Sequence, residues 1–157
     1  MKELTLVPLV WLMLGAGAPP QQGSGSEPGA AQQAEVSVTV MNMRNAQGVV
    51  RACMTPVSTQ FPKCRGAHGV HSATVKAHEG KLYLSFKDVK PGRYAIALLH
   101  DENANGKADR ALGMMPREGF GFSRDAPVRM GPPSFEDAVF EMAGHDRALT
   151  IRMRYML

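Results

Sequence analysis

The chain has 157 residues, which is enough for one domain with a substantial core and too few for two. Glycine and proline contribute 16 and 11 residues, an excess over average usage that suits a turn-rich β protein. The formal net charge is +4, but the basic residues are scattered along the chain, so the charge does not indicate a nucleic-acid-binding surface.

The first segment has the parts of a secretory signal. A short charged start at residues 1–3 precedes an apolar run at 4–14, and small residues follow at 15–18. The apolar run is too short to cross a bilayer as a stable helix, so no transmembrane anchor is expected after removal of the signal peptide, residues 1–18. The sequence therefore predicts a periplasmic or secreted protein.

The next segment, residues 19–34, consists largely of Pro, Gln, Gly, Ser and Ala. It has too few large apolar side chains to build a core, which predicts a disordered linker. The cleavage point of the signal is open: a cut after Ala18 leaves a proline at the new start, and a cut near Ala31 or Ala34 is the alternative. The folded domain is expected over residues 35–157.

From residue 35 onward, apolar and polar residues alternate with a period of two, as in half-buried strands. A Pro-Gly turn leads into the apolar run 94–100, which is typical of a central strand. No amphipathic helix pattern separates the strands, so the sequence predicts an all-β, two-sheet sandwich of about seven strands, with a long loop insertion at 103–136. The expected strands cover residues 36–43, 48–54, 71–77, 81–86, 94–100, 137–142 and 148–155.

The most specific segment is an Asp/Asn loop, residues 101–109, directly after the predicted central strand. Oxygen-bearing side chains occupy alternate positions, and Gly106 allows a sharp turn, which matches the D-x-[DN]-x-[DN]-G start of a calcium loop. The sequence therefore predicts a calcium site. The expected ligands are the side chains of Asp101, Asn103, Asn105 and Asp109, the backbone carbonyl of Lys107 and, from further along the insertion, the carboxylate of Glu118.

The loop departs from a helix–loop–helix calcium site. Leu112 stands at the twelfth position, where such sites have a bidentate glutamate, and a strand rather than a helix enters the loop. The small number of charged ligands predicts a dissociation constant of about 10⁻⁴ to 10⁻³ M, as in extracellular modules. The alternative interpretation is that the Asp and Asn residues only cap and bend a polar turn.

Cys53 and Cys64 are the two cysteines of the chain. In an oxidising compartment they predict one disulfide that closes the loop between them. A zinc site that also uses His68 and His71 is the alternative, although the cysteine spacing is unlike that of structural zinc knuckles.

Three segments, residues 91–109, 113–123 and 131–138, resemble the DUF2141 family, a bacterial family of unknown function. The resemblance covers the chain from roughly Glu35 to Tyr155. It implies a signal-bearing envelope or secreted protein with a transthyretin-like or immunoglobulin-like sandwich, and it brings no activity with it. The family pattern usually has Gly where this chain has Ala104.

The sequence favours a non-enzymatic module of the cell envelope, in which calcium stiffens the long loop for an envelope protein or glycan. Phe120, Phe122 and Phe135 are a candidate contact surface, and the alternative is that they plug the open end of the sandwich. A carbohydrate-binding module is a second hypothesis, weakened because Trp11 in the leader is the single tryptophan. A hydrolase is less favoured because no G-x-S-x-G elbow frames Ser123, and no catalytic residue is assigned.

Overall fold

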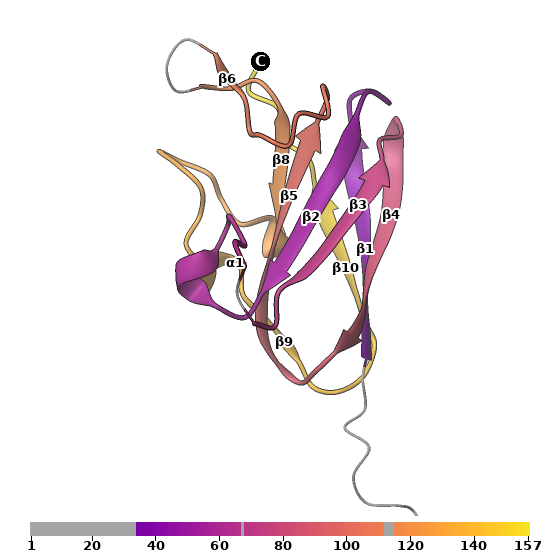
Figure 1. The fold of residues 1–157 in the computed structure, drawn as a ribbon, viewed down its shortest axis with the longest axis vertical. Helices are drawn as coiled ribbons and strands as arrows, with labels where there is room; N and C mark the ends of the chain where they lie inside the picture. Colours follow the sequence, from indigo (N-terminus) through magenta and orange to yellow (C-terminus); the bar gives the residue numbers. More distant parts are fainter. Residues whose placement is uncertain (1–33, 67, 112–114) are drawn as a thin grey trace, which may run out of the picture. The chain divides into compact units, whose positions relative to one another are not determined.

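The computed structural model describes residues 34–66, 68–111 and 115–157 (Figure 1). These residues belong to one unit, Ala31–Leu157. The predicted signal peptide, residues 1–18, and nearly all of the predicted linker lie outside the described residues. In the ranges described, no helix has the length and the apolar character needed to cross a membrane.

The smaller sheet is centred on β1. It consists of β10 (Arg147–Arg152), β1 (Ala34–Met43) and β4 (Gly80–Val89), in that order. β1 pairs with β10 in parallel and with β4 antiparallel. Val36, Val38 and Val40 are buried while the residues between them face outward, so the predicted alternation of this strand is confirmed.

The larger sheet is antiparallel, and its central strand is β5. Its order is β3 (His71–Lys76), β2 (Val49–Thr55), β5 (Gly92–Asp101) and β8 (Gly119–Phe122), and β9 (Phe140–Met142) pairs with the first residues of β5. β2 pairs along β5 from Val49 opposite Asp101 to Thr55 opposite Ala95. The apolar run predicted as a central strand therefore lies between two neighbours in the sheet.

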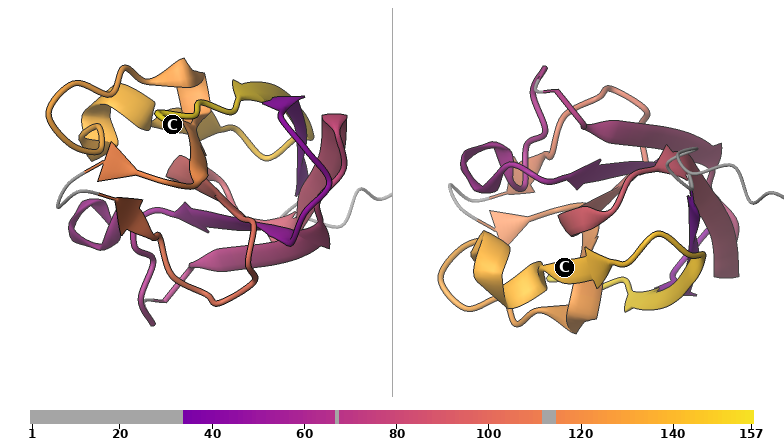
Figure 2. Two further views of the ribbon diagram at one scale, coloured as in Figure 1. Left: turned by 90° about the horizontal axis from the view of Figure 1, so that it is seen from above. Right: turned by 90° about the horizontal axis from the view of Figure 1, so that it is seen from below.

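The two sheets pack face to face around one main core (Figure 2). Both contribute fully buried side chains, because the inward positions of each strand carry apolar residues. Among the largest of them are Met54 and Ile96 from the larger sheet and Val38 and Ile151 from the smaller one. The predicted all-β sandwich is confirmed.

The segment predicted as one long loop, 103–136, contains more regular structure than expected. It includes β6 (Arg110–Ala111), β7 (Met115–Pro116), β8 and the 3₁₀ turn η2 (Ser123–Asp125). β8 pairs with β5 from Ala97 opposite Phe122 to His100 opposite Gly119. The interpretation of this whole segment as a loop outside the scaffold is therefore wrong.

The predicted strand at 137–142 also begins later than expected. Residues Phe135–Ala138 form the short helix α1, and only Phe140–Met142 are a strand. The Ser134 hydroxyl accepts from the backbone N–H of Asp137, and the Asp137 carboxylate accepts from the backbone N–H of Ser134. This capping box satisfies backbone groups of the first turn and favours helix over strand there.

Candidate functional site

The Asp/Asn loop starts at the end of the central strand. Asp101 is the last residue of β5 and is fully buried. Its carboxylate accepts hydrogen bonds from the backbone N–H groups of Asn105 (3.0 Å) and Gly106 (2.8 Å). These bonds curl the chain back over Asp101, and the φ of +77° at Gly106 lies in the left-handed region that glycine adopts without strain. The loop therefore has the sharp turn that its sequence predicts.

Asp109 accepts hydrogen bonds from both asparagine side chains of the loop. The amide N–H groups of Asn103 and Asn105 donate to Asp109 Oδ2 at 2.7 and 2.9 Å. Their amide oxygens accept from the loop backbone, Asn103 Oδ1 from Asn105 N–H at 3.0 Å and Asn105 Oδ1 from Lys107 N–H at 2.7 Å. The structure thus brings the predicted loop residues together in one hydrogen-bonded arrangement.

Glu118 returns to this loop from just before β8. It is 4% exposed, and its Oε2 accepts from the backbone N–H of Asp109 at 3.1 Å. Its other oxygen, Oε1, is buried and has no hydrogen-bond partner among the described residues. Burial first, and then the negative charges of Asp101 and Asp109, raise the pKa of Glu118 above its ordinary value. The predicted sixth ligand therefore lies at the loop with one oxygen unsatisfied.

Arg51, on the neighbouring strand β2, is a partner that the sequence does not reveal. Its Nε donates to Asp101 Oδ2 at 2.7 Å. Burial opposes ionisation of Asp101, but the hydrogen bonds from Arg51, Gly106 and Asn105 outweigh it and lower the pKa of this carboxyl. Asp101 is therefore an ionised carboxylate at neutral pH.

Arg44 links the Asp/Asn loop at Glu102 to Arg117, which follows the loop in the chain. Its guanidinium donates to both carboxylate oxygens of Glu102, at 2.8 and 2.5 Å, and to the backbone carbonyl of Arg117 at 3.0 Å. It also donates to the carbonyl of Leu157 and lies 4.5 Å from the ring centroid of Tyr155. The hydrogen bond from Arg44 is the largest cause of the lowered pKa of Glu102.

His100 is buried beneath the loop and makes two hydrogen bonds. One ring nitrogen, Nε2, lies 2.8 Å from the carbonyl of Gln47, which can only accept, so Nε2 carries a proton. The other, Nδ1, lies 2.8 Å from the hydroxyl of Tyr155, which accepts in turn from the backbone N–H of Arg44. His100 is therefore a satisfied interior side chain that joins β5 to the turn after β1 and to the chain's last residues.

A hollow of about 280 Å³ opens beside these groups. Its lining is polar throughout and consists of Arg44, Gln47, Glu102, Asn103, Asp109, Arg117 and Glu118. Within the described ranges, no three His, Cys, Asp or Glu side chains are arranged to hold a metal ion by themselves. A cation at this place needs the amide and carbonyl oxygens of the loop in addition to its carboxylates. Leu112, the position that departs from the helix–loop–helix pattern, lies outside the described residues.

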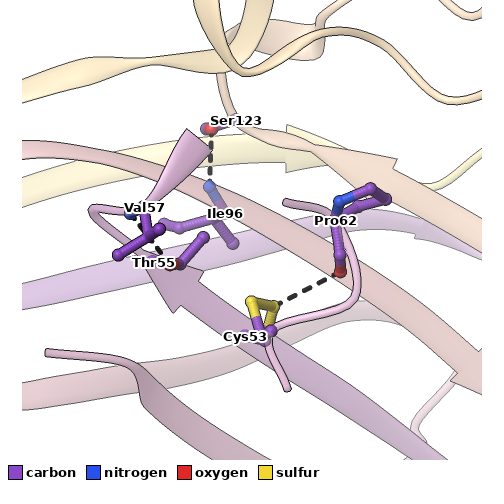
Figure 3. Close-up of a disulfide and its surroundings, with 7 residues drawn as sticks. Cys53, Thr55, Val57, Pro62, Ile96 and Ser123 are labelled. Atoms are coloured by element: carbon purple, nitrogen blue, oxygen red, sulfur yellow. Dashed lines mark hydrogen bonds between the residues drawn. A yellow bond between two sulfur atoms is a disulfide. The ribbon is translucent and has the colours of Figure 1, made fainter. Parts of the chain in front are cut away.

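The predicted disulfide is confirmed. Cys53 on β2 is bonded to Cys64, with the two Cα atoms 6.2 Å apart (Figure 3). Both sulfur atoms are therefore engaged with each other, and the alternative zinc site with His68 and His71 is wrong. The bond closes a loop that contains the 3₁₀ turn η1 (Ser58–Gln60).

This closed loop covers a second cluster of buried apolar residues on the outer face of the larger sheet. Phe61 lies 5.8 Å from Phe122 and 6.2 Å from Phe135, measured between ring centroids, in edge-to-face geometry. We call the covering segments, residues 56–66 and 123–139, the aromatic cover. The buried cluster also contains Ala95 and Phe120 from the sheet and Ala126 and Ala138 from the cover itself.

The predicted contact surface of phenylalanines is wrong. Phe120, Phe122 and Phe135 are 9%, 6% and 8% exposed, so their rings are not available to a partner. The reason is that β8 is a sheet strand whose outward face is closed by the aromatic cover, and burial of these rings is more favourable than their exposure. The alternative, that they plug the open end of the sandwich, agrees with their burial but not with their place, because they lie on the outer face of the larger sheet.

Ser123 is buried and serves the scaffold. Its hydroxyl accepts from the backbone N–H of Ile96 at 2.9 Å (Figure 3) and donates to the carbonyl of Ala138 at 2.5 Å. The side chain thereby ties β5 to the end of α1. His100 is engaged elsewhere, with its own partners at Gln47 and Tyr155.

The fold and the loop together define a class, a two-sheet β-sandwich whose central strand runs into an Asp/Asn loop. The chain belongs to DUF2141, a family described as an uncharacterized protein conserved in bacteria, whose model matches residues 38–150. The match covers most of the described residues, including the loop and the aromatic cover. No curated protein and no solved structure matches the chain.

Proposed function

We propose that this protein is an exported, non-enzymatic β-sandwich module that binds calcium at the Asp/Asn loop. The observation that supports the proposal best is the state of Glu118, a buried carboxyl group beside two other carboxylates, with one oxygen that has no hydrogen-bond partner in the part of the chain that the structure describes. Burial of a charged group without a partner is costly, and convergence of like charges adds to that cost. A divalent cation would remove both penalties.

The ligand set follows from the hydrogen bonds of the loop. In the structure, the amide NH₂ groups of Asn103 and Asn105 donate hydrogen bonds to the Asp109 carboxylate. Rotation of each amide about its last torsion exchanges the NH₂ group for the carbonyl oxygen, which is a calcium ligand. A bound cation would then replace two N–H donors as the positive partner of Asp109.

Calcium fits this loop better than magnesium does. The proposed donors are six residues that all supply oxygen, and they lie on an irregular, curled backbone rather than in an octahedral frame. Arg51 competes for Asp101 through its guanidinium, which lowers the affinity of the loop for a cation. We therefore expect a dissociation constant of about 10⁻⁴ to 10⁻³ M.

Export to the periplasm or the medium is supported by two independent features. The leader has the composition of a signal peptide. The disulfide between Cys53 and Cys64 is the kind of bond that persists in oxidising compartments and is rare in the cytosol. The partner in this proposal is an envelope protein or a glycan.

Thermal melting with and without calcium tests the proposal. At 10 mM calcium and a dissociation constant near 10⁻³ M, binding stabilises the folded state by about 1.4 kcal/mol, a shift of several degrees in Tm. Glu118→Gln keeps the size of the side chain but removes its charge, and it should abolish the shift. Glu141→Gln, an exposed glutamate on β9, is the matched control and should keep it. Equal melting of the unmodified protein in calcium and in chelator would refute the proposal.

The carbohydrate-binding hypothesis loses its main aromatic groups, since the three phenylalanines are buried. One large ring is well exposed among the described residues on the smaller sheet, Tyr83 on β4, at 70%. A sugar site that relies on several stacked rings is therefore not favoured. A glycan remains a candidate partner through polar contacts, which the hollow beside the loop can supply.

A further inference from the structure

The hollow beside the Asp/Asn loop would change its net charge if the proposed cation bound. Its ionisable lining consists of two arginines and three acids, so its net charge is −1 when all of them are ionised. A calcium ion held by Asp109 and Glu118 would change that to +1. The hollow would therefore repel an anion without calcium and attract one with calcium.

Arg117 is the side chain in this lining that is placed to meet such an anion. The ion pairs found in the described ranges involve Arg44, Arg51 and Arg93, and none involves Arg117. The backbone carbonyl of Arg117 accepts a hydrogen bond from Arg44 Nη2 at 3.0 Å, which fixes the position of the residue. The N–H groups of its guanidinium remain available to a ligand. Arg44, in contrast, is already paired on both oxygens of Glu102.

The coordination of calcium leaves room for a ligand from outside the chain. Calcium takes roughly six to eight oxygen ligands. Glu118 and the loop residues supply about six if each gives one oxygen, so up to about two positions stay open at the higher coordination numbers. Asn103, Asp109 and Glu118 also line the hollow, which means that an open position is reached from there.

From these contacts we propose that the hollow is a calcium-dependent binding site for a carboxylate group on a small hydroxylated molecule, such as a uronic acid. This inference rests on the proposed calcium site. One carboxylate oxygen would bind calcium, the other would accept from Arg117, and neighbouring hydroxyl groups would bond the polar lining. The volume of about 280 Å³ suits a single sugar unit.

The charge of the hollow favours a monoanion over the other small ligands. A single negative charge neutralises the net +1 of the calcium-loaded hollow, whereas a phosphate dianion would leave it at −1 beside three carboxylates. A neutral sugar would accept hydrogen bonds from Arg117 but would leave the net +1 of the calcium-loaded hollow unneutralised. An apolar ligand is excluded because every lining side chain is polar.

Isothermal titration of the purified protein with galacturonate, in calcium and in chelator, tests this inference. We expect binding in calcium and none in chelator, and we expect galactose, the neutral counterpart, to give no signal in either buffer. Arg117→Gln should weaken galacturonate binding about tenfold or more, since it removes a charged hydrogen bond. Arg65→Gln, an exposed arginine beside the disulfide, is the matched control and should bind as the unmodified protein does.

The calcium-dependent shift in Tm, measured on the same samples, separates the two proposals. A shift without galacturonate binding overturns the ligand site and leaves the calcium site intact. No shift overturns both. Equal binding of galactose and galacturonate, or full binding by Arg117→Gln, would contradict recognition of a carboxylate by this arginine.

Discussion

The aromatic cover and the Asp/Asn loop are two irregular regions of one sandwich, and different forces hold them. The cover is fastened by a disulfide and by edge-to-face rings on the outer face of the larger sheet. The loop is held by carboxylates, arginines and backbone N–H groups, and within the described ranges one carboxylate oxygen has no hydrogen-bond partner. We infer that the cover depends on redox state and on packing, whereas the loop depends on pH and on cations.

The largest expected effect comes from the packing of the cover. Phe122→Ala removes a buried ring from β8 and should lower the free energy of unfolding by about 3–5 kcal/mol. Chemical denaturation measures this loss. If the two regions are independent, the added stability from calcium should be the same in Phe122→Ala as in the unmodified protein, and a different calcium increment would show that they are coupled.

Loss of the disulfide should lower the free energy of unfolding somewhat less than Phe122→Ala does. Replacement of both Cys53 and Cys64 by serine frees a loop in the unfolded state and should cost about 3 kcal/mol. Denaturation of this double variant next to the unmodified protein gives the value. The Tm of the double variant should still be higher in calcium than in chelator. Loss of that difference would contradict the independence of the aromatic cover and the Asp/Asn loop.

The contribution of Glu118 to stability should change with pH in the opposite direction to that of the paired carboxylate Asp101. The pKa of Glu118 is raised above its ordinary value of 4.5, so protonation of this group stabilises the folded state, and that contribution is lost as the pH rises through the folded-state pKa. In chelator, Glu118→Gln should therefore be more stable than the unmodified protein at neutral pH, by about 1–2 kcal/mol.

Denaturation at several pH values measures that difference. It should shrink as the pH falls and vanish only below 4.5, where Glu118 is protonated in both the folded and the unfolded state. Asp101 has a lowered pKa, so its contribution is present at neutral pH and is lost only as the pH falls through its folded-state value. A variant that is less stable than the unmodified protein at neutral pH in chelator would contradict the unsatisfied state of Glu118.

The smallest expected effect lies in the backbone of the loop. Ala104 has a φ of +56°, a left-handed conformation that strains a residue with a Cβ atom. Ala104→Gly should relieve that strain and raise the free energy of unfolding by up to about 1 kcal/mol. Thermal melting in chelator would detect the change. Unchanged or lower stability would show that the loop bears no strain at this position.

The sequence predicts those parts of the molecule whose signals are local. Alternation in Val36, Val38 and Val40 identifies β1 because one face of that strand is buried. The spacing of Asp101, Asn103 and the residues that follow identifies the loop, because its hydrogen bonds join positions two to six residues apart. The cysteine pair is predictable for the same reason, since it closes one short loop.

The sequence does not predict β8, because its two glycines are typical of a loop. In the structure these glycines allow close packing against the strand. A Cβ atom on Gly119 would collide with the ring of Tyr155, and one on Gly121 would press on Ile151 and Met153. The partners of the loop are missed for a different reason. Arg44 and Glu102 are 58 positions apart, and only the strand pairing brings such residues together.

Consequences for motion follow from the single guanidinium of Arg44. It holds Glu102 in the Asp/Asn loop, Arg117 shortly before β8, and Leu157 at the chain's marked end, which lies at the same end of the sandwich as β6 (Figure 1). Three stretches far apart in the sequence should therefore open together rather than fray separately. In amide hydrogen exchange, their protection factors should rise and fall as one cooperative group.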